Sequence, residues 1–90
     1  MNIEQFLTDK VAAAVSTLYG NAGAPLQIQK TRKEFEGDYT LVVFPLLKAS
    51  RKSPEATATE IGEYLVANTP EIKAFNVIKG FLNLSVSYTH

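Results

Sequence analysis

The sequence predicts a single α+β domain in which an antiparallel β-sheet packs against helices on one of its faces. Two segments with apolar residues at three- and four-residue spacing indicate amphipathic helices, and the last segments alternate like strands. The order is helix, strand, strand or short helix, helix, strand, strand, which is typical of this class. A chain of 90 residues has the length of one domain, so we expect one domain over residues 1–90.

A first helix is predicted near the N-terminus by one apolar stripe. Asn2 is its expected N-cap, and Gln5 stands where a capping box requires it. The glycine- and proline-containing segment 20–25 ends the helix, and a short strand is expected from Leu26 to Gln29. The stripe consists of Ile3, Phe6, Leu7, Val11, Ala14, Val15 and Leu18.

The middle of the chain contains an ambiguous apolar run and a clear helix start. Tyr39 to Phe44 is interpreted as a buried strand, or as a strand that breaks into a short helix near Pro45. Ser53-Pro54-Glu55 begins the second long helix, because serine caps, proline suits the first helical position and glutamate meets the positive end of the dipole. Asn68-Thr69-Pro70 ends it. Its inner face is marked by Ala58, Ile61 and Leu65, with Gly62 beside them for close packing.

Two strands follow, Ile72 to Ile78 and Phe81 to Tyr88, joined by a tight turn at Lys79-Gly80. Side chains alternate between the two faces of a strand. The second strand therefore has one aliphatic face and one face with an aromatic ring, an amide and hydroxyl groups. The first face holds Leu82, Leu84, Val86 and Tyr88, and the second holds Phe81, Asn83, Ser85 and Ser87.

Composition argues against several classes of function. There is no cysteine and the only histidine is His90, so disulfide scaffolds, thiol nucleophiles, Ser-His-Asp triads and cysteine or histidine zinc sites are not expected. No run is long and apolar enough for a transmembrane helix, and the N-terminus does not resemble a secretory signal. We expect a cytoplasmic protein without a membrane partner. The net charge is zero, so any binding of nucleic acid should be weak or locally organised.

Six of the nine basic residues lie in two short segments. No acidic residue occurs between Tyr39 and Pro54, and such segregation can create a positive, phosphate-binding surface on a neutral protein. A solvated basic loop is the alternative interpretation. The six residues are Lys30, Arg32, Lys33, Lys48, Arg51 and Lys52.

Phe81 and Asn83 are the sharpest candidates for a binding site. An unstacked base can stack on an aromatic ring while a nearby amide hydrogen-bonds its edge. Stacking of this kind contributes roughly 1–3 kcal/mol per base. The alternative is that a helix or a twist of the sheet covers Phe81.

Four motifs carry a resemblance to a known family. They are Gly37-Asp38-Tyr39, the apolar run to Leu47-Lys48, Ser53-Pro54 at a helix start, and Gly80-Phe81-Leu82-Asn83. Each is weak alone, but in this order and spacing they resemble the N-terminal additional domain of arginyl-tRNA synthetase. The resemblance covers nearly the whole chain.

The resemblance implies an α+β domain that precedes a catalytic Rossmann domain and contacts the D-loop at the elbow of tRNA-Arg. The family's contact residues match Phe81 and Asn83, and the basic segments with Lys79 are expected to hold backbone phosphates. The family's enzyme joins arginine to tRNA with ATP and magnesium. Signatures for binding nucleotides are absent from these residues, so we expect an excised domain without catalytic residues, metal or cofactor of its own. Its expected partners are tRNA-Arg and the catalytic domain of the same chain, and it is expected to be a monomer.

The sequence also departs from the family pattern. Thr40 and Val42 stand in the region where many members have a glutamine and an asparagine, which argues against a polar contact from that strand. Lys79 replaces a proline that many members have, which adds a candidate phosphate contact and makes the turn less rigid. The remaining motif residues are expected to be structural, with glycine for the turn, aspartate capping backbone amides and tyrosine in the core. They are Gly37, Asp38, Tyr39 and Gly80.

Two other functions stay open. One is a protein-interaction module that pairs with a partner through an exposed strand edge and has no role with RNA. The other is a small hydrolase or metal-dependent enzyme that uses the loop carboxylates Glu34, Glu36 and Asp38. The spacing of these carboxylates matches no calcium loop, and a solvated acidic loop is the simpler interpretation.

Overall fold

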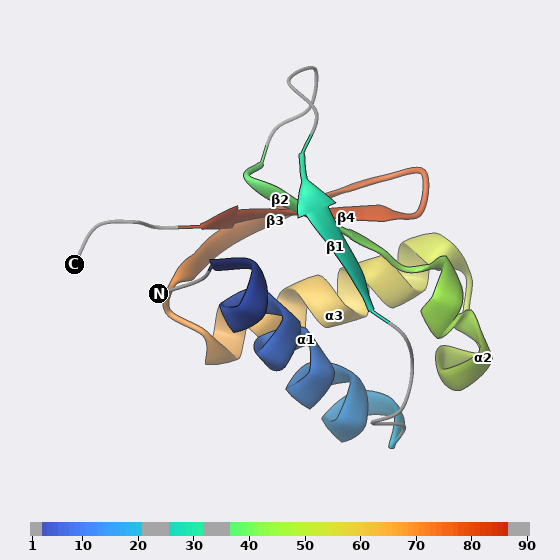
Figure 1. Ribbon diagram of the computed structural model, residues 1–90. Coiled ribbons are helices and arrows are strands. Elements are labelled where there is room, and N and C mark those ends of the chain that lie inside the picture. Colours follow the sequence, from blue (N-terminus) through green and yellow to red (C-terminus); the bar gives the residue numbers. More distant parts are fainter. Residues whose placement is uncertain (1–2, 21–25, 32–36, 87–90) are drawn as a thin grey trace.

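The chain forms two layers, a four-stranded antiparallel sheet and a layer of helices against one of its faces (Figure 1). The computed structural model describes residues 3–20, 26–31 and 37–86. The expected α+β class with helices on one face is confirmed. The strands lie in the order β1-β2-β4-β3, all in antiparallel pairs, and are β1 (Gln27–Lys30), β2 (Tyr39–Val42), β3 (Ile72–Ile78) and β4 (Phe81–Val86).

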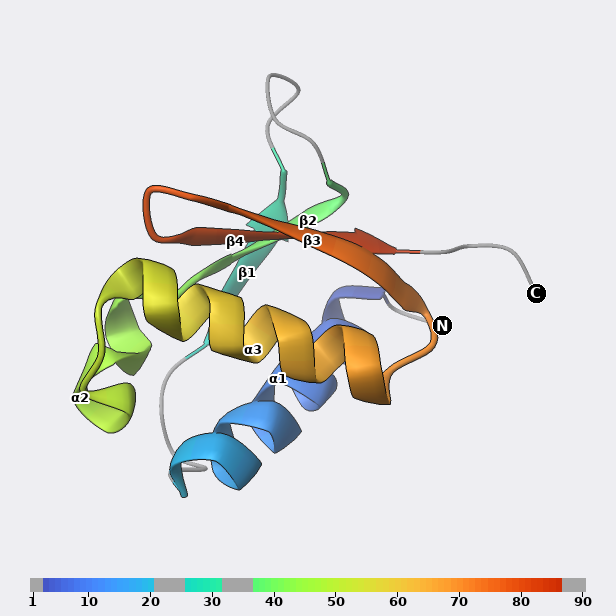
Figure 2. The same ribbon diagram turned by 180° about the vertical axis from the view of Figure 1, so that it is seen from behind.

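The two long helices lie on the same side of the sheet when the molecule is seen from the front and from behind (Figures 1 and 2). Within the described residues the helices are α1 (Ile3–Tyr19), the 3₁₀ helix η1 (Phe44–Leu46), α2 (Leu47–Ser50) and α3 (Pro54–Asn68). No helix among them is long and apolar enough to cross a membrane.

The start of α3 follows the sequence prediction. The Ser53 hydroxyl oxygen accepts a hydrogen bond from the Ala56 backbone N–H at 3.2 Å, and Pro54 is the first helical residue. Helix α1 ends at Tyr19, and Gly20 follows with φ +71° while its N–H donates to the Ser16 carbonyl. The expected cap Asn2 lies outside the described residues.

The core fills the space between the helices and the sheet. Apolar residues of α1, α3 and one face of β2 and β4 are fully buried there, because their period matches the element that carries them. The predicted inner faces of both long helices are confirmed. The central members are Leu7, Val11, Val15, Leu41, Ala58, Ile61, Leu65, Leu82 and Leu84.

The short elements required two corrections. Strand β1 is one residue later than predicted, because it pairs with β2 residue for residue and ends with Lys30 opposite Tyr39. The apolar run is a strand that breaks into short helices. Strand β2 stops at Val42, and Pro45 cannot donate the backbone hydrogen bond that a continuing strand needs. Strand β4 is described to Val86, and the predicted extension to Tyr88 lies outside the described residues.

Candidate nucleic-acid interface

The sheet face opposite the long helices carries the predicted binding residues. Residues paired across antiparallel strands share a face, so the register defines rows of side chains across the sheet. The row nearest the β3–β4 turn contains Gln27, Val42, Phe81 and Ile78. A second row on the same face contains Gln29, Thr40, Asn83 and Asn76.

Phe81 lies on this face at the start of β4 and is 37% exposed. The long helices lie on the other side of the sheet (Figure 2). Its neighbour is Phe44 of η1, whose ring meets it edge to face with a centroid separation of 6.0 Å and an interplanar angle of 82°. The Phe81 ring is therefore partly covered by another aromatic ring and partly available to a ligand.

Asn83 is on the same face but is only 2% exposed. The Thr40 hydroxyl donates to Asn83 Oδ1 at 2.6 Å, and the Thr31 and Thr40 hydroxyls are 2.9 Å apart. Asn83 Nδ2 is buried and has no hydrogen-bond partner within the described residues. A base edge can reach this amide only if the atoms that cover it move. The Thr40 hydroxyl is thus engaged inside the protein.

The Gly37-Asp38-Tyr39 motif ties the start of β2 to the end of β4. Asp38 Oδ2 accepts a hydrogen bond from the Val86 N–H at 2.8 Å, and the Asp38 N–H donates to the Leu84 carbonyl at 2.8 Å. Gly37 has φ +118°, and a Cβ on it would lie 3.1 Å from Asn83 Cβ. Tyr39 packs against the core. These contacts agree with the expected structural role of the motif.

The β3–β4 turn has positive φ at both of its central residues, +47° at Lys79 and +80° at Gly80, as in type I′ hairpin turns. Proline has φ fixed near about −65° and cannot adopt the Lys79 backbone. The expected loss of rigidity relative to proline therefore does not apply to this turn. A Cβ on Gly80 would lie 2.8 Å from Phe44 Cζ and 3.0 Å from Pro54 Cβ, so glycine also leaves room for these neighbours.

The predicted basic residues that the structure describes do not all lie at the same end of the molecule. Lys48 on α2 and Arg51, the C-cap of α2, lie at the end of the molecule that also carries the Lys79 turn (Figures 1 and 2). Lys30 lies opposite Tyr39, at the other end of β2 from Val42 and Phe81. The positions of Arg32 and Lys33 lie outside the described residues.

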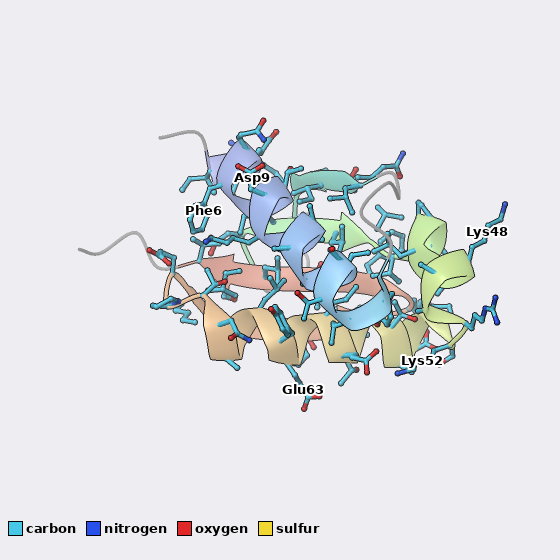
Figure 3. The ribbon with its side chains drawn as sticks, turned by 90° about the horizontal axis from the view of Figure 1, so that it is seen from below. Phe6, Asp9, Lys48, Lys52 and Glu63 are labelled. Atoms are coloured by element: carbon cyan, nitrogen blue, oxygen red, sulfur yellow. The ribbon has the colours of Figure 1, made fainter. Side chains whose placement is uncertain are left out.

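Lys52 is near this end of the molecule but is engaged with an acid (Figure 3). Its Nζ lies 2.9 and 2.8 Å from the two carboxylate oxygens of Glu60, which also accepts a hydrogen bond from the Tyr19 hydroxyl at 2.6 Å. Burial and the bond to Glu60 raise the pKa of the Tyr19 phenol. Lys52 is thus paired with Glu60 in the free domain, in an exposed ion pair of small stabilising effect.

Replacing Glu60 with glutamine is expected to lower the free energy of unfolding by about 0.5 kcal/mol at pH 7, because this exposed ion pair is lost. The hydrogen bonds from Lys52 and Tyr19 hold the pKa of the Glu60 carboxyl below its ordinary value. Such a group stabilises the fold above its unfolded pKa of about 4.3, and this contribution disappears as the pH falls through the lower folded pKa. Urea unfolding at neutral and acidic pH checks this, and a difference that persists in acid would contradict it.

Phe44 was not singled out by the sequence, which placed it in a continuous apolar run. The structure leaves it 49% exposed at the first position of η1. Pro45 was the sequence signal that could have identified Phe44, because a proline is not accommodated in a central strand. The strand alternation therefore does not extend to the residue before it.

Of the three loop carboxylates considered for a metal-dependent enzyme, the structure describes Asp38. Asp38 is engaged with the Val86 N–H, and Glu34 and Glu36 lie outside the described residues. Across the ranges that the structure describes, no three His, Cys, Asp or Glu side chains are grouped so that they could hold a metal ion.

These features define a two-layer α+β domain whose sheet has one face free of long helices. A model of the family described as "Arginyl tRNA synthetase N terminal domain" matches residues 5–86. The chain belongs to this family.

Individual relatives agree with the family match. The chain is 60% identical over 89 residues to the arginine–tRNA ligase of Bacteroides fragilis and 42% identical over 92 residues to that of Amoebophilus asiaticus. These alignments cover 97% and 99% of this chain and 15% of each relative. The solved Thermus thermophilus arginyl-tRNA synthetase matches with a TM-score of 0.71 and 27% identity, over 91% of this chain and 13% of that one. The chain thus spans about 15% of the length of the curated relatives it matches.

Proposed function

We propose that this chain is the tRNA-contacting N-terminal domain of a longer arginine–tRNA ligase. Its family membership and its coverage of 15% of relatives named arginine–tRNA ligase support this. On this proposal residues 1–90 form one domain that acts as a monomer in the cytoplasm and contributes no catalytic residue. Arginylation, with ATP and magnesium, belongs to a catalytic domain of the same parent chain.

The proposed contact is between the open sheet face and an unstacked base in the D-loop of tRNA-Arg. The observation that carries it is the exposed ring of Phe81 on the face away from the long helices. A base stacked on this ring would bury apolar surface that water now contacts. Asn83 offers a buried amide donor without a partner in the described residues, and such a donor gains free energy when an acceptor reaches it.

In this proposal the base stacks on Phe81 before it reaches Asn83, because Asn83 is buried in the free domain. Lys48, Arg51 and Lys79 supply positive charge at the same end of the molecule. Since the net charge is zero, we expect the domain alone to bind weakly and the remainder of the enzyme to supply most of the affinity.

The alternative, pairing of a partner with a strand edge, is less favoured by the edges of the sheet. The edge strand β1 is only four residues long, and β3 at the other edge carries Lys73 next to a register shift between Ile72 and Ala74. Short edges, lysine and irregular register are the means by which native sheets discourage edge-to-edge pairing.

Substituting Phe81 with alanine is expected to weaken binding of a tRNA-Arg transcript by about 5- to 150-fold, the equivalent of roughly 1–3 kcal/mol of stacking. The measurement is an NMR titration of the 90-residue chain at low salt. Val66→Ala is the matched control, because Val66 on α3 is also 37% exposed.

A second transcript in which abasic nucleotides replace the unpaired D-loop bases tests where the ring acts, because any base that remained could still stack on it. The proposal expects this transcript to bind more weakly to the unmodified domain and to be insensitive to Phe81→Ala. Equal affinities for both transcripts, or equal losses in Phe81→Ala and Val66→Ala, would count against it. Strong self-association without RNA binding would instead favour the interaction module.

A further inference from the structure

The exposed aromatic surface of the domain is larger than Phe81. Within the described residues the exposed large hydrophobic side chains are Phe44, Phe81 and Val66, and the first two are in contact. Phe44 is the more exposed of the two rings, at 49%. Singly exposed apolar residues are ordinary on protein surfaces. Here two exposed rings from separate elements adjoin, so the surface offers more than one flat face for stacking.

The Phe44 ring is held in place. A Cβ placed on Gly80 would lie 2.8 Å from Cζ and 3.3 Å from Cε2 of this ring, so the tip of the ring packs closely against the glycine. Phe81 contacts it from the side. These contacts restrict the ring before any ligand arrives, which reduces the entropy that binding costs.

The angle between the rings determines what they can bind. At 82° the two ring planes are nearly perpendicular, so they cannot sandwich one flat base between them. A base stacked on Phe81 and a base stacked on Phe44 would also be nearly perpendicular to each other. The pair suits two nucleotides whose bases are splayed apart, as in a single-stranded loop, and it does not suit a stacked helix.

The charges around Phe44 favour a nucleic acid over an apolar protein partner. Lys48 follows Phe44 by four residues, and Lys79 precedes Gly80, on which the ring rests. Arg51 ends α2 on the same side of the molecule. Lys48, Arg51 and Lys79 form no ion pair within the part of the chain that the structure describes. Glu55 in the first turn of α3 offsets part of this charge.

Two of these basic residues occupy backbone conformations that glycine would prefer. Arg51 has φ +57° and Lys79 has φ +47°, and among the described residues they are the non-glycine positions with positive φ. Such conformations disfavour residues with a Cβ. A residue with a long cationic side chain stands at both positions, where glycine would be less strained, and this is consistent with use of its charge.

We infer that Phe44 is a second base-stacking residue, which receives a nucleotide adjacent to the one that stacks on Phe81, with Arg51 and Lys79 beside the phosphates of this pair. The inference rests on the proposed function, because it extends the same RNA-binding surface. To the proposed function it adds Phe44 as a contact residue. It also requires that the two bound bases be unstacked from each other, because the two ring planes are nearly perpendicular.

The test is a double-mutant cycle with Phe44→Ala, Phe81→Ala and the combined variant, measured as affinity for the tRNA-Arg transcript at low salt. Each single substitution is expected to weaken binding about 5- to 150-fold. Because the two rings are in contact, their effects are expected to couple and need not multiply. The inference requires that Phe44→Ala still weakens binding clearly in the Phe81→Ala background, since each ring would hold its own base. Val66→Ala again serves as the control.

Two further variants separate stacking from packing. Phe44→His is expected to weaken binding much less than Phe44→Leu, because imidazole keeps a flat face and is shorter than the phenyl ring, whose Cζ already abuts Gly80. Leucine packs on Gly80 but has no flat face to stack, so Phe44→Leu is expected to lose binding nearly as Phe44→Ala does. Urea unfolding of each variant shows whether the fold is retained. The histidine–leucine comparison keeps the test decisive if Phe44→Ala fails to fold.

The other outcomes overturn the inference. If Phe44→Ala weakens binding only when Phe81 is present, Phe44 merely positions Phe81. If Phe44 variants bind normally while Phe81→Ala binds weakly, the second stacking site is wrong and the proposed function stands. If neither ring matters, both the inference and the proposed function fail.

Discussion

Replacing Gly62 with alanine is expected to destabilise the domain, although alanine is the better helix former. A Cβ on Gly62 would lie 2.5 Å from Phe75 Cδ2, 2.6 Å from Cγ and 2.9 Å from Cε2. Cγ is fixed close to the β3 backbone, so a side-chain rotation alone cannot relieve the contact. Overpacking of this kind outweighs the gain in helix propensity, and we expect a net loss of about 1–2 kcal/mol.

Urea unfolding measures this loss, and the matched control is the same substitution in a Phe75→Ala background. With the ring removed, only helix propensity remains, and Gly62→Ala is expected to stabilise by up to about 1 kcal/mol. The sign of the effect should therefore reverse between the two backgrounds. Stabilisation by Gly62→Ala in the unmodified protein would show that α3 and β3 can separate at little cost.

Replacing Asp38 with alanine is expected to lower the free energy of unfolding by about 1.5–3 kcal/mol, because a charge-assisted hydrogen bond is lost. Strand β2 begins at Tyr39, opposite Leu84, so the carboxylate of Asp38 supplies the acceptor for the Val86 N–H at 2.8 Å. Without it, the Val86 N–H loses this acceptor, while the backbone bond from the Asp38 N–H to the Leu84 carbonyl and the pairing of β4 with β3 remain.

Asp38→Asn is the matched control for this substitution. Its amide oxygen can still accept from Val86, so the loss should be clearly smaller than in Asp38→Ala. Hydrogen exchange should show reduced protection at the Val86 amide in Asp38→Ala. Similar stabilities of all three proteins would rule out the structural role.

The same variants also separate structure from RNA contact. If the motif is structural, folded Asp38→Asn should bind the tRNA-Arg transcript as the unmodified domain does. A strong loss of affinity with unchanged stability would mean that Asp38 itself contacts RNA.

The sequence predicted helices, strands and turns well where interactions between residues close in the chain determine them. Ser53 and Pro54 predicted the start of α3 because capping involves residues only three positions apart. Alternation in β4 predicted which side chains face the core, since the pleat has a fixed period of two. The Lys79-Gly80 turn was also predicted from neighbouring residues, because tight hairpin turns favour glycine at their central positions.

Periodicity was not enough in the run that follows Tyr39. Four strand residues and four helical residues are too few to show either period. The outcome was decided by Pro45 and by the tertiary position of η1 against the β3–β4 turn.

The candidate site shows most clearly which features the sequence alone does not reveal. The sequence by itself determined that Phe81 and Asn83 share a face, because that follows from strand geometry. Only the tertiary structure decided that Asn83 is buried, through its contact with Thr40, 43 residues away in the chain. It likewise brought Phe44 to Phe81 and separated Lys30 from Lys79. Burial and proximity depend on strand order and register, which pair segments that are distant in sequence and leave no local pattern.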